Sequence, residues 1–159
     1  MQTFLPYEDF ANAARCLDNA RLGKQRIEAK TILNILMGKK SGWANHPATK
    51  MWRGHEGSLC LYLKEVILEW TKRGFKNECQ RVVTKKGKVW VWTTKHGKPR
   101  MFADLTPPPW LGNAAFHSSH RSNLLRKKPE WYSQFGWKDD PTAPYVWPDV
   151  SSRMETSST

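Results

Sequence analysis

The sequence predicts a mainly α, compact single-domain helical fold with a small inserted antiparallel β element at about residues 81–102. Two stretches carry apolar residues at helical spacing, and a third alternates with the two-residue period of strands. The length of 159 residues suits one domain of about 100–200 residues. We expect this domain to span residues 1–148, and residues 149–159 to form a disordered tail because they are mostly small and polar.

The first predicted helix spans residues 17–38. Gly38 stands where a C-cap belongs, and Asp18 or Asn19 is a candidate N-cap. Its apolar positions at helical spacing are Leu22, Ala29, Ile32, Leu33 and Leu36.

A connector over residues 39–54 separates this helix from a second one, predicted from about Glu56 to Arg73. The connector contains Gly, an Asn-His-Pro run and little periodicity. The second helix has one apolar face, and basic residues followed by Gly74 mark its end.

The β element follows from β-rich runs at 82–84, 89–94 and 100–102, separated by Lys-Gly-Lys and His-Gly-Lys-Pro turns. This pattern predicts a small antiparallel meander. From Arg81 to Arg100 the chain has seven Lys and Arg and no acidic residue, so one cationic face is expected. A solvated charged hairpin would explain the same run, but we favour a nucleic-acid contact through Lys85, Lys86 and Lys88.

The C-terminal third begins with a rigid extended segment, residues 106–110, and continues with a helix predicted over residues 113–127. Residues 130–148 are rich in Trp, Tyr and Pro and are expected to pack irregularly over the helices.

Composition narrows the class of function. The 26 Lys and Arg exceed the 14 Asp and Glu and give a net charge of +12, which favours a polyanionic partner. The 19 aromatic residues can stack on bases, although they can also simply fill a core. No apolar run approaches the ~20 residues of a membrane span, and acidic residues stand near the N-terminus where a signal sequence would be basic. The three Cys form no C-x-x-C pair, which favours a reducing, cytoplasmic setting.

The most informative candidate cluster lies on the first helix. Arg21, Lys24 and Gln25 fall within about 60° of Glu28, so a carboxylate stands within a basic surface at the edge of the apolar face. Such a carboxylate is suited to proton transfer on a DNA sugar while the cations hold phosphates. An ordinary Lys24–Glu28 ion pair is the simpler explanation of the spacing.

Histidines offer further candidates. His55 lies at the entrance to the second helix, where unpaired N–H groups favour a phosphate. His117 and His120 lie three residues apart beside Arg121, and are interpreted as donors to phosphates or as structural hydrogen-bonding groups. No second set of ligands stands at metal-binding spacing, so neither a metal nor a cofactor is expected.

Several ordered blocks resemble the phage pyrimidine-dimer DNA glycosylases of the endonuclease V type. They are His46-Pro-Ala-Thr, Trp52-Arg-Gly-His-Glu56, Leu61-Tyr-Leu-Lys64, Lys72-Arg-Gly-Phe75 and Pro129-Glu-Trp-Tyr-Ser-Gln-Phe-Gly136, together with the helix around Glu28. The resemblance extends in order over nearly all of residues 1–137. It implies a compact helical fold that binds and kinks duplex DNA and displaces a nucleotide from the stack.

The resemblance also implies roles for individual residues. An N-terminal α-amine attacks the sugar C1′, and the essential helix carboxylate matches Glu28. Arg21 matches a position that contacts DNA, with Lys24 and Arg26 as phosphate neighbours. Gly54-His55 matches the Gly-His that opens the next helix, and Trp131 and Tyr132 match the aromatic loop near the lesion. Arg53, just before His55, is expected to contact DNA as well. The basic positions His117, His120, Arg121 and Lys127 complete the expected DNA contacts.

An α-amine has an ordinary pKa near ~8 against ~10.4 for Lys, so a larger fraction is neutral and nucleophilic at pH 7. The sequence departs from the family at this point, because a bulky Gln2 hinders removal of Met1. The amine is then that of Met1, or of Gln2 if Met1 is removed, or the lyase step is absent. The element at 81–102 is a second departure, because short family members lack it.

These observations predict a DNA N-glycosylase that flips and removes a damaged or modified pyrimidine, with abasic-site lyase activity through a Schiff base. Alternatives are a monofunctional glycosylase for a hypermodified pyrimidine and a non-catalytic DNA-binding module. The expected partner is double-stranded DNA containing such a base, bound by a monomer in the cytoplasm of a bacterium or a phage-infected host, without a membrane.

Overall fold

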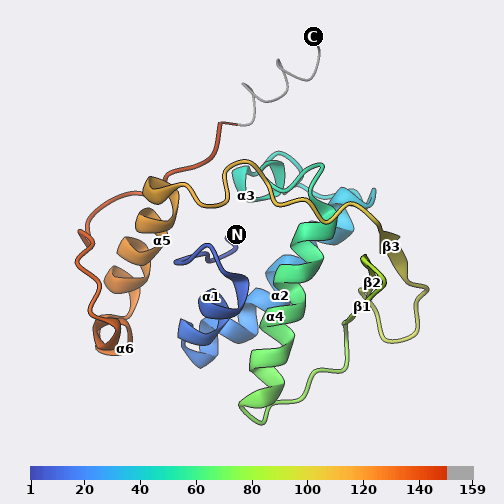
Figure 1. The fold of residues 1–159 in the computed structure, drawn as a ribbon, viewed down its shortest axis with the longest axis horizontal. Helices are drawn as coiled ribbons and strands as arrows, with labels where there is room; N and C mark the ends of the chain where they lie inside the picture. The colour runs from blue at the N-terminus through green and yellow to red at the C-terminus, as the bar shows by residue number, and fades with distance from the viewer. Residues whose placement is uncertain (150–159) are drawn as a thin grey trace.

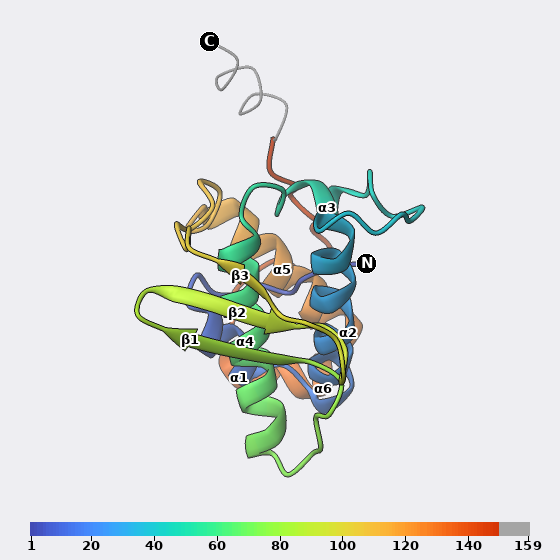
Figure 2. The ribbon, with the colours of Figure 1, turned by 90° about the vertical axis from the view of Figure 1, so that its right-hand side faces the viewer.

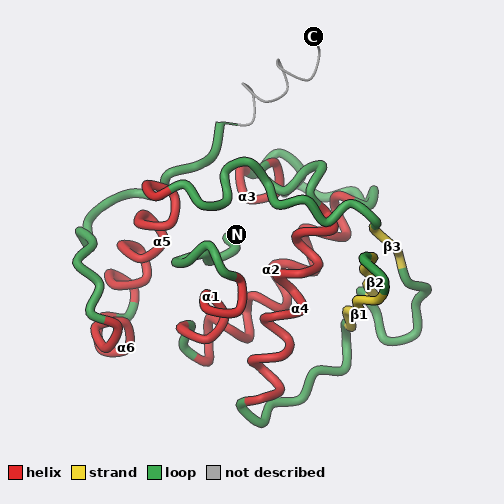
Figure 3. Tube along the Cα trace, in the orientation of Figure 1, coloured by secondary structure: helices red, strands yellow, loops and turns green. Residues whose placement is uncertain are grey.

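The computed structural model describes residues 1–149, which form six α-helices, one 3₁₀ turn and three strands (Figures 1 and 3). The helices are α1 (Phe10–Cys16), α2 (Asn19–Leu36), α3 (Pro47–Lys50), α4 (Glu56–Lys72), α5 (Ala114–Lys127) and α6 (Pro129–Tyr132), and the 3₁₀ turn is Ser133–Phe135. The strands are β1 (Arg81–Lys85), β2 (Lys88–Trp92) and β3 (Arg100–Phe102). The predicted mainly helical fold with a small β element is confirmed.

Helices α2 and α4 pack against each other and carry much of the core. Their contact is close at Gly23, where an added Cβ would lie 2.9 Å from the ring of Trp70. The predicted stop signals hold, since Gly38 and Gly74 adopt positive φ angles of 112° and 93° just beyond the two helices. Asp18 occupies the N-cap position of α2, but its side chain makes no capping hydrogen bond.

The three strands form an antiparallel sheet in the order β1-β2-β3, which confirms the predicted meander. Val82 pairs with Val91, and Val89 pairs with Phe102. Val89 and Val91 are buried because the two-residue period turns both toward the core. Figure 2 shows the sheet lying across α4, with the long axes of the strands running across the helix.

Helix α5 stands on the other side of the N-terminal segment from α2 and α4 (Figures 1 and 3). Asn113 caps it by accepting a hydrogen bond from Phe116 N at 2.9 Å. The segment 130–148, expected to be irregular, begins with α6 and the 3₁₀ turn, and only residues 136–149 contain no helix or strand. They pack back on the domain, for example through the bond from Trp137 Nε1 to the Tyr7 hydroxyl at 2.8 Å.

Three short helices, α1, α3 and α6, lie where none was predicted. The N-cap of α1 is Asp9, whose carboxylate accepts from Asn12 N at 3.0 Å, so the missed helix did carry a capping signal. Helix α3 interrupts the predicted connector. It begins with Pro47 in its first turn, and His46 Nδ1 accepts from Ala48 N at 3.0 Å.

Of the predicted tail, only Asp149 belongs to the described residues, and residues 150–159 lie outside them. Within residues 1–149, no helix has the length and apolar character to span a membrane. Cys16, Cys60 and Cys79 are free thiols.

Candidate active site

The N-terminal segment is fixed to α2 by the buried side chain of Gln25. Gln25 Oε1 accepts from Phe4 N at 2.9 Å, and its Nε2 donates to the Gln2 carbonyl at 3.0 Å. The buried Tyr62 hydroxyl donates to the same Oε1 at 2.7 Å. One amide therefore satisfies backbone groups on two residues of the segment, much as a neighbouring strand would.

Two further contacts hold the first three residues. Trp52 Nε1 donates to Thr3 Oγ1 at 3.0 Å, and Thr49 Oγ1 lies 3.7 Å from the Met1 sulfur. Met1 is half-buried against the core, whereas Gln2 is buried, with its side-chain oxygen accepting from Thr3 N at 2.9 Å. The chain thus presents the α-amine of Met1 from a rigid base.

The other side of the segment is held by α5, which corrects the expected phosphate contacts of His117 and His120. His117 Nε2 accepts from Gly112 N at 2.9 Å, so its Nδ1 carries the proton and donates to the Leu5 carbonyl at 2.8 Å. His120 Nδ1 accepts from Leu5 N at 2.9 Å. Both rings are buried, and burial lowers the pKa of His117 and lowers that of His120 to about 3. Their role is structural.

His46 lies near the start of the chain, because it caps α3, whose Thr49 hydroxyl lies 3.7 Å from the Met1 sulfur. The charges of the Met1 α-amine and of Glu28 both act on its imidazole. Partial burial and the nearby α-amine charge lower the pKa of His46, and the charge of Glu28 opposes that change. Because His46 Nδ1 accepts from Ala48 N, the neutral ring carries its proton on Nε2. An amine, a carboxylate and a neutral imidazole therefore share one electrostatic environment.

The cations next to Glu28 differ in how firmly they are held. Lys24 Nζ lies 4.0 Å from Glu28 Oε1, and the side chain of Lys24 is 72% exposed against 14% for Glu28. The predicted ion pair is therefore present but loose, and Lys24 can reach solvent. Arg21 Nη1 lies 3.3 Å from Asp18 Oδ1, which directs it along the same face of α2.

The aromatic residues expected near the lesion, Trp131 and Tyr132, are anchored instead. Tyr132 is fully buried; its hydroxyl donates to Asp18 Oδ1 at 2.5 Å and accepts from Asp18 N at 3.1 Å. Burial raises the pKa of Asp18, but the bond from Tyr132 and the charge of Arg21 outweigh it and leave the pKa below its usual value. Half-buried Trp131 donates from Nε1 to the Cys16 carbonyl at 2.8 Å. The buried Tyr132 ring is not available to stack on DNA.

Two of the expected DNA-binding arginines are engaged within the protein. Arg26 lies on the opposite face of α2 from Glu28, with its guanidinium 4.4 Å from the Trp70 ring centroid and a bond to Asn77 at 2.9 Å. Arg121 Nη1 donates to the Pro6 carbonyl at 2.7 Å and its Nε to Asp139 at 2.9 Å. Both guanidinium groups connect segments of the fold.

The start of α4 is closed, which argues against the phosphate site expected there. His55 occupies the N-cap position and Arg53 is exposed just before it, with a long bond to the Ala44 carbonyl at 3.4 Å. However, the backbone of Asp104 packs onto the first turn, since a Cβ on Gly57 would lie 2.2 Å from the Asp104 carbonyl oxygen.

The remaining predicted contacts are on the surface. Lys85, Lys86 and Lys88 are exposed at the β1–β2 turn, and Lys127 is exposed at the end of α5. Lys86 adopts a positive φ of 53°, which turns the chain between the strands. Among the described residues, no side-chain ion pair restrains these three turn lysines.

Sequence reasoning missed His46 and Gln25 as members of the site. His46 stood in a motif block, but the helical period says nothing about a connector that folds back to the N-terminus. Gln25 was noted only as a neighbour of Glu28. A buried amide in the middle of an apolar stripe was the available signal that it binds another segment.

The site is equipped for nucleophilic and proton-transfer chemistry with the groups of the chain itself. Within residues 1–149, no group of three or more His, Cys, Asp and Glu side chains is arranged to hold a metal ion. The amine offers a lone pair, the carboxylate accepts or delivers a proton, and the imidazole offers an N–H donor.

A family model described as pyrimidine dimer DNA glycosylase matches residues 1–82. This range contains α1 to α4, the Met1 amine, Glu28 and His46. It ends in β1, so most of the sheet, α5 and the C-terminal segment lie beyond it. No curated protein and no solved structure matches the chain.

Proposed function

Because the chain belongs to the pyrimidine dimer DNA glycosylase family, we propose that it removes a damaged or modified pyrimidine from duplex DNA by attack of its own α-amine on the sugar. The observation that carries this proposal is the placement of Met1 against α3, where Thr49 Oγ1 lies 3.7 Å from the Met1 sulfur and His46 caps the helix. The charges of the Met1 amine and of Glu28 both act on His46. Family membership supports the glycosylase reaction, and the geometry supports the choice of nucleophile.

The reaction proposed for this site begins with the neutral amine. Its lone pair forms a bond to C1′, the glycosidic C1′–N bond breaks, and the base leaves with that electron pair and takes up a proton. The sugar ring then opens to an iminium, with a proton delivered to the ring oxygen. Glu28 moves the proton between the attacking amine and the ring oxygen, and this transfer is the usual work of a general acid–base. Loss of a C2′ proton from the iminium eliminates the 3′ phosphate and nicks the strand.

Neighbouring cations support DNA binding at the same face. Arg21 and Lys24 lie on the α2 face that carries Glu28, and Lys24 is the more exposed of the two. The turn lysines add a second cationic surface farther along the molecule. Phosphate contacts of this kind set affinity and register without reading the base.

Trapping with borohydride tests the nucleophile directly. We expect a covalent adduct with a duplex containing one abasic site, and peptide mapping should place it on the α-amine of Met1. Acetylation of that amine should abolish the adduct, whereas Lys24→Gln should leave it. An adduct on Lys24 would overturn the assignment of the N-terminal amine.

Base release without an adduct would instead favour the second candidate function, a monofunctional glycosylase that uses an activated water. Glu28 is then its base, because its half-buried carboxylate lies at the same site. A protein that binds DNA but neither releases a base nor forms an adduct would be a non-catalytic module.

A further inference from the structure

An aromatic cluster lies at the edge of the candidate active site and has no part in the reaction described above. The His46 ring centroid lies 5.5 Å from that of Trp43 and 5.9 Å from that of Trp147, and both contacts are edge-to-face. We call these three side chains the aromatic cluster. Because His46 caps α3, and the Thr49 hydroxyl of that helix lies 3.7 Å from the Met1 sulfur, the cluster lies beside the N-terminal residue.

Trp43 is unusually open for a large aromatic residue. It stands on the loop before α3 and is 51% exposed, the highest exposed fraction among the large apolar residues of residues 1–149. Its backbone N–H bonds to Ser41 Oγ at 3.1 Å, which shapes the turn that presents it. An indole ring that meets its neighbour edge-to-face leaves ring surface available for another π system.

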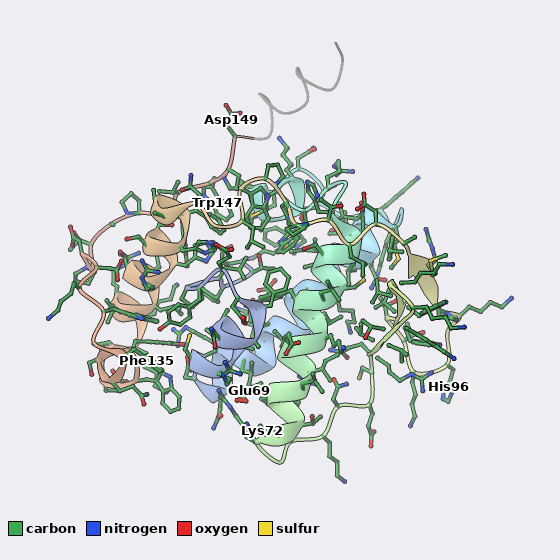
Figure 4. All side chains as sticks on the ribbon, in the orientation of Figure 1. Glu69, Lys72, His96, Phe135, Trp147 and Asp149 are labelled. Atoms are coloured by element: carbon green, nitrogen blue, oxygen red, sulfur yellow. The ribbon has the colours of Figure 1, made fainter. Side chains whose placement is uncertain are left out.

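Trp147 reaches the cluster from the far end of the chain. Val146 N donates to Ser119 Oγ of α5 at 3.0 Å, and the Tyr145 ring lies 5.5 Å from His120 and 5.7 Å from Trp147. Figure 4 shows Trp147 on the C-terminal segment, above the N-terminal residues. The family match ends at residue 82, so this wall of the site is supplied by a part of the chain outside the match.

Packing alone does not account for this arrangement. A Trp that served only to fill the core would be expected in an interior position like that of Trp52, which is fully buried and hydrogen-bonded. Trp43 and Trp147 instead both meet the His46 ring edge-to-face, beside the helix whose Thr49 contacts Met1. Aromatic side chains in a cationic setting are the usual means of holding unstacked bases.

We propose that Trp43, His46 and Trp147 form the stacking surface for the pyrimidine that leaves the duplex, so that its C1′ faces the Met1 amine. This inference rests on the proposed function and names the base-binding part of that site. Stacking is tolerant of base identity, so the surface admits pyrimidines of more than one structure. The base is held only until the glycosidic bond breaks.

Comparison of two DNA substrates tests the proposal, because an abasic site has no base to stack. One duplex carries a cyclobutane thymine dimer or a single modified pyrimidine from which the wild-type protein releases base, and the other carries an abasic site at the same position. We expect Trp43→Ala and Trp147→Ala each to slow single-turnover base release about tenfold, as for loss of one stacked base. Borohydride trapping on the abasic duplex should stay within about twofold of wild type.

Conservative and control variants complete the experiment. Trp43→Phe and Trp147→Phe should restore most of the rate, because a smaller ring still stacks. Val146→Ala removes an exposed apolar side chain from the same segment and should leave both reactions unchanged. Thermal melting of each variant checks the fold.

Three outcomes would count against the aromatic cluster. Unchanged base release in both Ala variants, equal losses on the two DNAs, or failure of the Phe variants to recover would each overturn this inference while leaving the proposed function intact. A wild-type protein that releases no base and forms no adduct would overturn the proposed function, and the inference with it.

Discussion

The N-terminal site and the β1–β2 turn differ in what holds their functional groups. Backbone atoms of residues 2, 4 and 5 at the site bond to side chains of α2 and α5 that are almost wholly buried. The turn between β1 and β2, in contrast, carries the exposed side chains of Lys85, Lys86 and Lys88. Figure 2 shows the β1–β2 turn at the left of the molecule and the N-terminus at the right.

This difference in restraint suits two different functions, chemistry at one atom and attraction of phosphates. Chemistry at C1′ requires a reacting atom held to within a fraction of an ångström, and buried hydrogen bonds supply that restraint. Phosphate attraction acts over about a Debye length, roughly 8 Å at physiological salt, so flexible lysines are sufficient. The four predictions below test this division, beginning with the largest expected effect.

Glu28→Gln should abolish chemistry while preserving DNA affinity. An amide of the same shape cannot transfer a proton, so single-turnover base release should fall by about 10²- to 10⁴-fold. Affinity should hold or increase, because a negative charge leaves a basic surface. Glu65→Gln, another half-buried helical carboxylate, is the control and should retain activity. A near wild-type rate in Glu28→Gln would reduce Glu28 to an ordinary partner of Lys24.

Gln25→Ala should destabilise the fold and displace the amine together. It leaves the N–H of Phe4 without its acceptor and the Gln2 carbonyl without its donor, at about 1–3 kcal/mol for each unsatisfied group. The Tyr62 hydroxyl keeps the Phe4 carbonyl, 2.9 Å away, as an acceptor. We expect a loss of about 2–4 kcal/mol in the free energy of unfolding, measured by urea denaturation. Exposed Gln134→Ala should cost much less. Equal losses would mean that the Gln25 amide does not restrain the segment.

Lowering the pH should weaken the contact between α5 and the N-terminal segment, because His120 then takes up a proton. The unfolded ring binds a proton near its ordinary pKa of 6.5, whereas the folded ring does so only at about 3. Stability from this group is therefore complete above pH 6.5 and falls as pH drops toward 3, by about 2–3 kcal/mol at pH 4.5.

The variant His120→Asn keeps an acceptor for Leu5 N but cannot titrate. Its unfolding free energy should depend less on pH between 6.5 and 4 than that of the wild type. His96→Asn, at an exposed position, should leave the pH profile as it is. The same profile in the wild type and His120→Asn would contradict this account.

Neutralising Lys85, Lys86 and Lys88 to Gln should have the smallest effect on chemistry. Each lost phosphate contact reduces the log–log salt slope by about 0.9, so the slope should become shallower by about 2–3 from an expected −4 to −5. Base release at saturating protein should match wild type. Complete loss of turnover would place this turn within the active site, and the turn could then not be described as a surface that only attracts phosphates.

Local patterns in the sequence were sufficient for the long helices and the sheet but insufficient for the short helices and the site. Period and stop signals gave α2, α4 and the meander, because those features depend on neighbours within a few residues. For the histidines of α5 the sequence left both phosphate contacts and structural hydrogen bonds open, because their partner, Leu5, is more than a hundred positions away. Tyr132 was misplaced for the same reason, since Asp18 is 114 positions from it. His46 was not predicted as a member of the site, because the return of the connector to Met1 is a tertiary contact that no local pattern indicates.

The contacts between residues 5–6 and α5 also govern the order in which the protein matures. Leu5 and Pro6 emerge first from the ribosome, yet their partners His120 and Arg121 are made about 115 residues later. Helices α1 to α4 can begin to pack earlier, because domains gain structure as synthesis proceeds. Residues 5–6 are therefore fixed only near the end of translation, whereas Gln25 and Trp52, which hold residues 2–4, are made much earlier. A nascent chain stopped before α5 would hold the first residues on one side only.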